Sequence, residues 1–242
     1  MSYMNAENLI KQYGSGEATV TAVSGVSFGI ESGEFVAIMG ESGSGKSTLL
    51  SMLGGLNSPT AGRFSVDGVD IYGLTSDERA DFRKTSIGFV FQNFNLLPYL
   101  TLAENVMLPL AIVNTSKKQK HSRAVDALER VGLRGKANRL PNQISGGEQE
   151  RVAIARAIVN RPPIILADEP TGNLDTRTGA EIMRLLSALN LDGVTVVMVT
   201  HSNEYAHCAS RLIRLSDGHL VSEETLKVFA RRADPAAHLP VH

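Results

Sequence analysis

A glycine-rich segment at residues 40–47 constrains this chain more than any other part of its sequence. The segment reads Gly-Glu-Ser-Gly-Ser-Gly-Lys-Ser, which fits the pattern Gly-x-x-x-x-Gly-Lys-Ser/Thr. An apolar run typical of a buried strand precedes it at residues 35–39, and a segment of helical composition follows at residues 47–53. A strand, a glycine loop and a helix in this order predict a phosphate-binding loop at the positive end of a helix dipole. An ordinary glycine-rich turn is the alternative.

The residue types in this loop predict separate tasks. Gly40, Gly43 and Gly45 allow the backbone to fold around an anion with its N–H groups turned inward. We expect Lys46 to reach the β- and γ-phosphates of a nucleotide, and the hydroxyl of Ser47 to ligate Mg²⁺. The sequence thus predicts a site for a nucleotide with its magnesium ion.

Two further apolar runs, at residues 164–167 and 194–199, predict strands buried on both faces, as in parallel sheets. Between them, residues 178–189 carry leucine and isoleucine at helical spacing. A strand, a helix and a strand of these lengths indicate a right-handed crossover in an α/β fold.

Polar residues follow the predicted strands at the edge where open α/β sheets bind ligands. Asp168 can hold Mg²⁺ through water, and Glu169 can accept a proton from an attacking water molecule. A solvated acidic turn before Pro170 is the alternative. His201 could contact the γ-phosphate and Gln92 could contact Mg²⁺ or water, although a surface histidine and a loop glutamine are the simpler interpretations.

Two segments depart from the strand and helix alternation. Antiparallel strands are expected before and after the glycine loop, at residues 20–23, 26–28, 63–66 and 71–72. An inserted helical subdomain is expected over residues 94–160, with helices at residues 102–113, 122–131 and 148–159. We therefore predict one domain over residues 1–242, with a core at about 1–93 and 161–222 and a loose tail at about 223–242.

Charge and cysteine content exclude several classes of protein. The 24 Lys and Arg residues balance 25 Asp and Glu residues, which does not favour a nucleic-acid binder. The single cysteine, Cys208, excludes a disulfide framework. Residues 1–14 show no secretory leader, and the most apolar stretch, residues 96–113, contains Glu104 and two prolines, so no membrane span is expected. A cytoplasmic location is the default expectation.

A second glycine turn comes before the predicted helix at residues 148–159. Ser145 is placed to cap this helix, and Gly146 and Gly147 make its start ready for an anion. The helix would be about 21 Å long, so its start would be too far from Lys46 if its end packs near the core. Either this turn binds something else, or it serves a nucleotide held by another copy of the chain.

The order of these motifs over residues 6–222 resembles the ATP-binding subunit of ABC transporters, with a P-loop NTPase (RecA-like) core. The resemblance rests above all on the sequence Ser-Gly-Gly-Glu-Gln at residues 145–149. Ile144 stands where leucine is commoner in that family, a change between similar apolar residues. The resemblance implies a head-to-tail dimer, either of this chain or with a related ATPase, around two ATP molecules and Mg²⁺.

The resemblance also implies roles for single residues. Ser145, Gly147 and Gln149 would close on the γ-phosphate held by the partner subunit's Lys46. Asp175 would lie in a loop that crosses the dimer interface, and Tyr13 would stack on adenine, unless it is merely a packed turn aromatic. Catalytic roles would fall to Glu169, His201, Lys46 and Gln92, and metal contacts to Ser47, Gln92 and Asp168. The expected nucleotide-binding residues are Tyr13, Gly40, Ser42, Gly43, Ser44, Gly45, Lys46, Ser47, Thr48, Ser145, Gly146, Gly147, Gln149 and Asp175.

Residues 87–98, 102–109 and 167–175 resemble more closely the lipoprotein-release and macrolide-export group of these ATPases, with a cell-division ATPase as a near relative. In that group ATP cycles do mechanical work on a membrane partner. We expect an integral membrane permease to dock near residues 96–113 and to hold the chain at the cytoplasmic face of the inner membrane, although about half of the leucines there could instead pack inside the helical subdomain. The rival hypothesis is a nucleotide-gated scaffold in which hydrolysis is secondary.

Overall fold

The structure, a computed structural model, describes residues 2–226 of the chain. Its centre is a six-stranded sheet in the order β10-β9-β3-β8-β7-β6, in which all strands but the antiparallel β10 run parallel. The bounds are β3 Phe35–Met39, β6 Ile87–Val90, β7 Ile164–Asp168, β8 Thr195–Thr200, β9 Arg211–Ser216 and β10 His219–Thr225. The expected strands at residues 35–39, 164–167 and 194–199 are confirmed.

The central strands are apolar on both faces because each face is covered by a different layer. On β3, Phe35, Ala37 and Met39 pack with the helical side of the molecule. Val36 and Ile38, which point the other way, pack with α1 (Lys46–Leu53) and the second sheet. This burial on both faces removes the polar alternation that a half-exposed strand would show.

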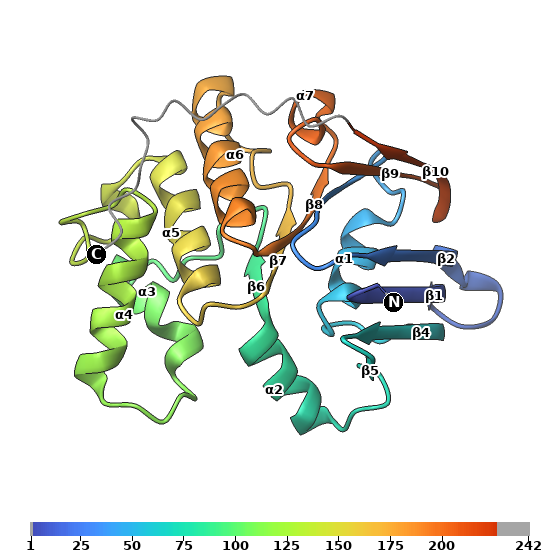
Figure 1. Cartoon of the computed structure of the whole chain (residues 1–242), viewed down its shortest axis with the longest axis horizontal. Helices are drawn as coiled ribbons and strands as arrows, with labels where there is room; N and C mark the ends of the chain where they lie inside the picture. The colour runs from blue at the N-terminus through green and yellow to red at the C-terminus, as the bar shows by residue number, and fades with distance from the viewer. Residues whose placement is uncertain (1, 227–242) are drawn as a thin grey trace.

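The second sheet is antiparallel, in the order β2-β1-β4-β5, and lies on the opposite side of the central sheet from the helical subdomain (Figure 1). Its strands are β1 Met4–Tyr13, β2 Val20–Ile30, β4 Ala61–Val66 and β5 Val69–Asp70. The expected strands at residues 20–23 and 26–28 are one continuous strand, whose register shifts near Gly25, a residue with φ of 69°.

The strand expected at residues 71–72 is wrong, because β5 ends at Asp70. Ile71 is fully buried below the sheet, and the Tyr72 hydroxyl donates to the carbonyl oxygens of Met52 and Asn57 at 2.6 and 2.9 Å. The Ile71 N–H still donates to the Phe64 carbonyl oxygen of β4 at 2.9 Å, so the pairing ends at Ile71, and Tyr72 is held by its hydroxyl instead. Strand β1 was not expected, because a bulge and the left-handed Asn8 (φ 50°) interrupt its alternation.

The helical subdomain consists of α3 Leu102–Met107, α4 Lys117–Arg130 and α5 Gly146–Ile158. The helix expected at residues 102–113 is too long, since the chain tightens into a 3₁₀ turn at Leu108–Leu110 with Pro109 inside it. The helix expected from residue 122 begins five residues earlier, because Ser116 and Gln119 form a capping box.

The remaining helices are α2 Ser76–Ser86, α6 Thr176–Leu191 and the short α7 Asn203–Ala206. Helix α6 confirms the crossover helix expected at residues 178–189 and packs beside α5 (Figure 1). Of the tail expected from residue 223, residues 223–225 belong to β10, and residues 227–242 lie outside the described part. Among residues 2–226, none of the helices combines the length and the apolar character that crossing a bilayer requires.

Helix α5 contains a buried acidic residue that the motif analysis did not single out. Glu150 is 1% exposed, and both of its carboxylate oxygens lack a hydrogen-bond partner. Burial raises the pKa of its carboxyl group to about 8, opposed in part by the charge of Arg156. The folded chain therefore holds this proton across a pH range in which the unfolded chain has lost it.

Glu150→Gln tests this description of the core. The folded-state pKa of Glu150 is raised. The free energy of unfolding of the parent chain therefore falls as pH rises from about 4.5 toward about 8. We expect the free energy of unfolding of Glu150→Gln, relative to the parent, to increase by roughly 1–4 kcal/mol between pH 5 and pH 8.5 in urea titrations. The exposed Glu204→Gln is the matched control. Parallel pH profiles for the parent and Glu150→Gln would contradict this prediction.

Candidate functional site

The carboxyl ends of four parallel strands bring the predicted polar residues to one edge of the central sheet. Met39, the last residue of β3, lies beside Thr200 at the end of β8. Asp168 at the end of β7 lies beside Val199, and Val90 at the end of β6 lies beside Ala167. The glycine loop, Gln92, Glu169 and His201 all follow these ends. Parallel pairing in register therefore creates the site.

The glycine loop leaves β3 and enters α1 through backbone conformations that suit glycine. Gly43 and Gly45 have φ of 82° and 93°, and Gly45 stands at the N-cap of α1. A Cβ on Gly45 would lie 2.1 Å from the carbonyl oxygen of Ala22, whereas a Cβ on Gly43 would meet nothing within 4 Å. In the described part of the chain, the N–H groups of Gly43 and Gly45 have no hydrogen-bond partner. The loop can therefore offer them to an anion.

Lys46 is the buried cation of this loop. The residue is 7% exposed, and its Nζ donates to the carbonyl oxygen of Glu41 at 2.7 Å and to the Ser44 hydroxyl at 3.5 Å. Within residues 2–226 it forms no ion pair with a carboxylate. A buried ammonium group supported only by neutral oxygens fits a site that takes a polyphosphate.

Ser47 and Asp168 form the oxygen pair of the site. The Ser47 hydroxyl donates to Oδ1 of Asp168 at 3.0 Å. Burial raises the pKa of the Asp168 carboxyl group, while the hydrogen bond from Ser47 opposes the shift and the neighbouring Glu169 adds to it. A hydroxyl and a partly desolvated carboxylate are the hard oxygen donors that Mg²⁺ binds, so these two residues fit a magnesium ion.

Glu169, Gln92 and His201 meet at a single carboxylate oxygen. Oε2 of Glu169 accepts a hydrogen bond from Nε2 of Gln92 at 3.2 Å and lies 3.1 Å from Nδ1 of His201. Glu169 has a left-handed backbone (φ 46°), so its side chain takes a direction different from that of Asp168, one residue earlier. The Glu169 side chain is 18% exposed, which leaves the carboxylate open to water.

Asn173 belongs to this cluster and was missed by the motif analysis. Its Nδ2 donates to the carbonyl oxygen of Gln92 at 2.9 Å, which ties the loop before α6 to the loop after β6. An asparagine in the turn that follows Pro170 gives no signal of such a contact in the sequence.

The second glycine turn lies in the helical subdomain and is held by its own helix. Ser145 caps α5 in a capping box with Glu148, and Glu148 forms an ion pair with Lys136. The hydrogen bond from Lys136 is the largest cause that lowers the pKa of the Glu148 carboxyl group. Gln149 donates to the carbonyl oxygen of Pro141 at 3.1 Å. These side chains make no hydrogen bond to the glycine loop of the same chain in the described residues.

The second turn instead adjoins the loop expected at the dimer interface. A Cβ on Gly147 would lie 2.2 Å from Cγ2 of Thr178, so only glycine allows α5 to approach α6 this closely. Asp175 caps α6 by accepting hydrogen bonds from the Thr178 hydroxyl and backbone N–H at 2.6 and 3.1 Å, and these bonds lower the pKa of its carboxyl group. Two elements that were expected to face another copy therefore lie side by side.

Tyr13 lies apart from these groups, at the end of β1. Its side chain is 44% exposed, its hydroxyl accepts a hydrogen bond from Asn57, and Nζ of Lys11 lies 5.1 Å from the ring centroid. A half-exposed ring held at its hydroxyl end presents a face on which a planar base could stack.

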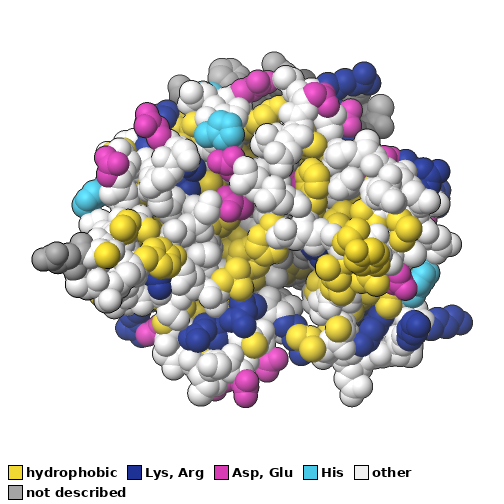
Figure 2. All heavy atoms as spheres, turned by 180° about the vertical axis from the view of Figure 1, so that it is seen from behind, with side chains coloured by type: hydrophobic (Ala, Val, Ile, Leu, Met, Phe, Trp, Pro, Cys, Tyr) yellow, Lys and Arg dark blue, Asp and Glu magenta, His cyan; other side chains and the backbone are white. Residues whose placement is uncertain are grey.

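The segment at residues 96–113 divides into buried and exposed apolar residues. Leu102, Val106 and Leu110 are fully buried. The exposed members are Leu97 (47%), Tyr99 (91%), Leu108 (39%) and Ile112 (66%), which we call the apolar surface. Figure 2 shows that apolar side chains on the rear face of the molecule gather in groups. Exposed groups of this kind often mark a partner's contact surface.

Asn105 fixes the loop that carries half of the apolar surface. It is fully buried, its Nδ2 donates to the carbonyl oxygens of Leu97, Leu100 and Thr101 at 3.0–3.1 Å, and its Oδ1 accepts from the Leu97 N–H at 2.7 Å. Leu97 and Tyr99 are thus presented on a satisfied backbone and not on a loose loop.

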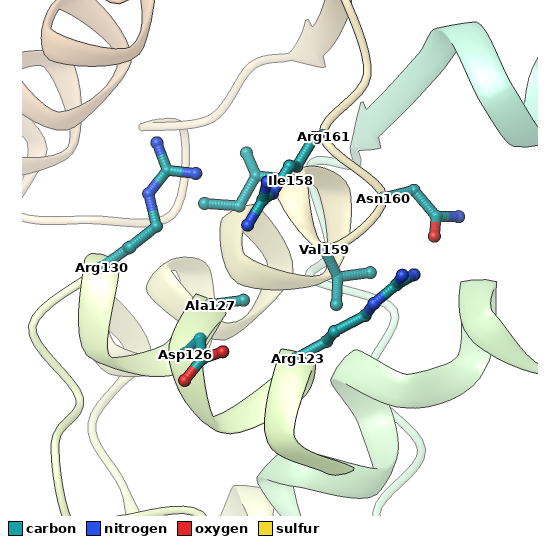
Figure 3. A pocket seen from close by; sticks show the side chains of 8 residues that line it. All are labelled: Arg123, Asp126, Ala127, Arg130, Ile158, Val159, Asn160 and Arg161. Carbon is teal, nitrogen blue, oxygen red and sulfur yellow. The ribbon is translucent and has the colours of Figure 1, made fainter. Parts of the chain in front are cut away.

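A separate hollow of about 250 Å³ lies between α4 and the end of α5 (Figure 3). It contains none of the predicted site residues. Arg130, one of its three arginines, pairs with Asp192 at 3.4 Å, outside the hollow. The lining residues are Arg123, Asp126, Ala127, Arg130, Ile158, Val159, Asn160 and Arg161. This hollow is not part of the candidate nucleotide site.

Comparisons with known proteins place the chain in one family. Residues 23–172, more than half of the chain, match the family model described as ABC transporter. The chain is 50% identical over 219 residues to a macrolide export ATP-binding/permease protein MacB of Rhodopirellula baltica, covering 89% of this chain but 32% of that protein. It therefore spans about a third of the length of such relatives. It is also 48% identical to the uncharacterized ABC transporter ATP-binding protein YknY of Bacillus subtilis, covering 88% of this chain and 93% of that protein.

A solved structure supports the fold independently. The dimeric post-hydrolysis state of the ATP-binding cassette MJ0796, from Methanocaldococcus jannaschii, bound to ADP and Pi, is 48% identical to this chain. The match has a TM-score of 0.86 and covers 93% of this chain and 99% of the other. The expected P-loop NTPase fold, with its antiparallel sheet and helical subdomain, is confirmed.

The two left-handed glycines of the loop give a matched test of its geometry. Both Gly43→Ala and Gly45→Ala incur about 1–2 kcal/mol of backbone strain, but only Gly45→Ala also collides with the carbonyl of Ala22. We expect Gly45→Ala to lose at least 1 kcal/mol more of unfolding free energy than Gly43→Ala and to lose most of its MgATP affinity. Urea denaturation and fluorescent-nucleotide titration measure both effects. Equal losses in the two variants would show that the loop is not packed as described.

Proposed function

The chain belongs to the ABC transporter family, and we propose that it is the ATP-hydrolysing subunit that drives a membrane permease of the lipoprotein-release and macrolide-export group. It is an ABC ATPase that uses ATP and Mg²⁺. The observation that supports our assignment of the catalytic residues is the meeting of Gln92 and His201 at one oxygen of Glu169, at 3.2 and 3.1 Å. This cluster lies at the same sheet edge as the buried Lys46 and the pair formed by Ser47 and Asp168.

We assign nucleotide binding to the glycine loop. The N–H groups of the loop and Lys46 would neutralise the phosphates, because a buried ammonium group interacts strongly with an anion in a site of low dielectric constant. Ser47 and Asp168 would hold Mg²⁺, with Gln92 as a further contact. When bound, this ion supplies positive charge at the phosphate oxygens and helps the leaving group depart.

Hydrolysis follows from the position of Glu169. A water molecule attacks the γ-phosphorus, its proton passes to Oε2 or Oε1 of Glu169, and the bond to the ADP oxygen breaks. Gln92 orients the carboxylate, and His201 orients both the carboxylate and the γ-phosphate. Two neighbours therefore direct the carboxylate that we assign as the general base.

The second copy of the chain would complete each site. Ser145, Gly147 and Gln149 of one copy would face the phosphate on the partner subunit's Lys46, with the loop at Asp175 between them. The solved relative that is dimeric and bound to ADP and Pi supports this arrangement. The contact of Gly147 with Thr178 gives the second turn and the Asp175 loop a common position, so both can meet a partner together.

Glu169→Gln tests the assignment of the base. The amide keeps the size and hydrogen-bonding reach of the side chain but cannot take a proton, so we expect ATP affinity to be retained and turnover to fall by at least 100-fold. A dimer trapped by MgATP should then be visible in analytical ultracentrifugation.

Glu204→Gln, an exposed change on α7, is the matched control and should hydrolyse ATP at the parental rate. Undiminished turnover in Glu169→Gln would exclude this residue as the base. The parent chain could also bind the permease in response to ATP and yet hydrolyse ATP at a negligible rate, even with the permease present. That result would favour the nucleotide-gated scaffold over a subunit that drives the permease by hydrolysis.

For the permease, we assign the docking site to the apolar surface formed by Leu97, Tyr99, Leu108 and Ile112. It begins five residues after Gln92, so a partner that contacts it is connected to the catalytic cluster by a short piece of chain. Cargo specificity would then belong to the permease, and the chain would be held at the cytoplasmic face of the membrane by that contact. The MacB relatives are named as ATP-binding/permease proteins, so they combine the two parts in one protein. This supports the proposal that the chain has a membrane partner.

Tyr99→Ser tests the docking site. Tyr99 is 91% exposed, so we expect its replacement to change the unfolding free energy by less than about 0.5 kcal/mol and to leave basal ATP hydrolysis intact. Affinity for the permease in detergent, measured by surface plasmon resonance, should fall at least tenfold. Leu191→Ser, at an 82% exposed position on α6, is the control. Equal binding by both variants would place the docking site elsewhere.

A further inference from the structure

Arg156, near the end of α5, grips the loop that follows β6. Its Nη1 donates to the carbonyl oxygen of Asn95, and its Nη2 donates to that of Phe94, each at 2.6 Å. The two nitrogens of one planar guanidinium group therefore bind two successive carbonyls, a geometry that a lysine ammonium group cannot reproduce.

Phe94 and Asn95, the two residues that Arg156 binds, have an unfavourable backbone conformation. Phe94 and Asn95 have φ of 57° and 49°, and two consecutive non-glycine residues in the left-handed region each cost about 1 kcal/mol or more. Such a conformation persists only where other contacts fix it. The two hydrogen bonds from Arg156 act directly on these two residues.

The same short loop carries Gln92. Gln92 lies two residues before Phe94; its side-chain amide donates to Glu169, and its backbone carbonyl accepts a hydrogen bond from Asn173. Residues 92–95 are thus attached to the core at Gln92 and to the helical subdomain at Phe94 and Asn95. A shift of α5 relative to the core therefore has to change the position of Gln92 or break one of these bonds.

Among residues 2–226, the guanidinium group of Arg156 binds the loop and no carboxylate. Burial lowers the pKa of its guanidinium group, opposed by the charge of Glu150 on the same helix, yet in the described residues it makes no ion pair. An arginine that merely closed the end of its own helix would bind carbonyl oxygens of α5. Arg156 instead uses carbonyls 61 and 62 positions away in the sequence.

We propose that Arg156 is a positioning residue that fixes Gln92 against Glu169 according to the placement of the helix that begins at Ser145. This inference rests on the proposed role of Gln92 in hydrolysis. Through Arg156, the arrival of a partner at the Ser145 end of α5 reaches the catalytic cluster as a displacement of residues 92–95.

Arg156→Lys tests this proposal, with Arg151→Lys as the matched control. Arg151 also lies on α5 and donates to a carbonyl oxygen, that of Val131, and to Glu181, each at 2.9 Å, but it does not touch the loop. We expect Arg156→Lys to lower kcat for ATP about tenfold while KM changes less than twofold. Arg151→Lys should leave both constants within twofold of the parent. If Arg156→Lys shows no cooperative thermal unfolding transition, Arg156→Gln, whose side-chain amide still donates, replaces it. We expect Arg156→Gln also to lower kcat with little change in KM.

Combination with Gln92→Ala distinguishes positioning from general stabilisation. If Arg156 acts through Gln92, Arg156→Lys should lower kcat by less than twofold in the Gln92→Ala background. The proposal would be overturned if the kcat losses of Arg156→Lys and Gln92→Ala multiply in the double variant. It would also be overturned if Arg156→Lys lowers kcat no more than Arg151→Lys does. A Gln92→Ala variant with parental turnover would overturn the proposed role of Gln92 instead, which is a different outcome.

Discussion

The positive charge of Lys46 is buried in the glycine loop, and this burial limits what the site can bind. Removing a positive charge from water costs several kcal/mol unless other groups replace the lost hydration. The loop supplies only the Glu41 carbonyl and the Ser44 hydroxyl, and the two carboxylates at the same sheet edge, Asp168 and Glu169, are engaged by Ser47 and by Gln92. A buried cation with only two neutral oxygen partners in the described residues is what our proposal of phosphate binding at Lys46 rests on.

Asp168 and Glu169 are adjacent in the sequence, but their carboxylates point to different partners because the backbone turns between them. Asp168 is the last residue of β7 and stays in the sheet register, so its oxygen meets Ser47 at the start of α1. Glu169 enters the left-handed region and points toward Gln92 and His201. The two carboxylates therefore meet different partners although they are neighbours in the sequence, which is the basis of our proposal that Asp168 holds the metal ion and Glu169 acts on water. The strain at Glu169 is the kind of local cost that functional sites retain.

The sequence was most informative where one residue type has one physical use. The glycine loop, the doubly buried strands and the serine that caps α5 could all be predicted, because steric freedom, apolar runs and capping chemistry are local properties. Strand β1 could not, since its bulges and the left-handed Asn8 hide its alternation. The exact end of α3 also depended on one proline within an apolar run whose length suggested a longer helix.

The contacts that connect the two halves of the site could not be predicted at all. Arg156 and Asn173 bind main-chain carbonyls 61 and 81 positions away in the sequence, and any polar side chain at the right distance could do so. Their partners are backbone atoms, which carry no sequence signature. Only the fold brings them together, and for this reason the contact between α5 and the loop that carries Gln92 is visible in the structure alone.

We propose that the glycine loop of one chain and the Ser145 turn of a second chain serve one nucleotide. A mixing experiment tests it most directly, using a Lys46→Ala chain, which keeps a normal Ser145 turn, and a Ser145→Arg chain, which keeps a normal glycine loop. Each variant alone should hydrolyse ATP at a few per cent of the parental rate or less, whereas an equimolar mixture should regain a substantial fraction, because mixed dimers contain one intact composite site. A mixture whose rate equals the average of the two variants alone would contradict the account.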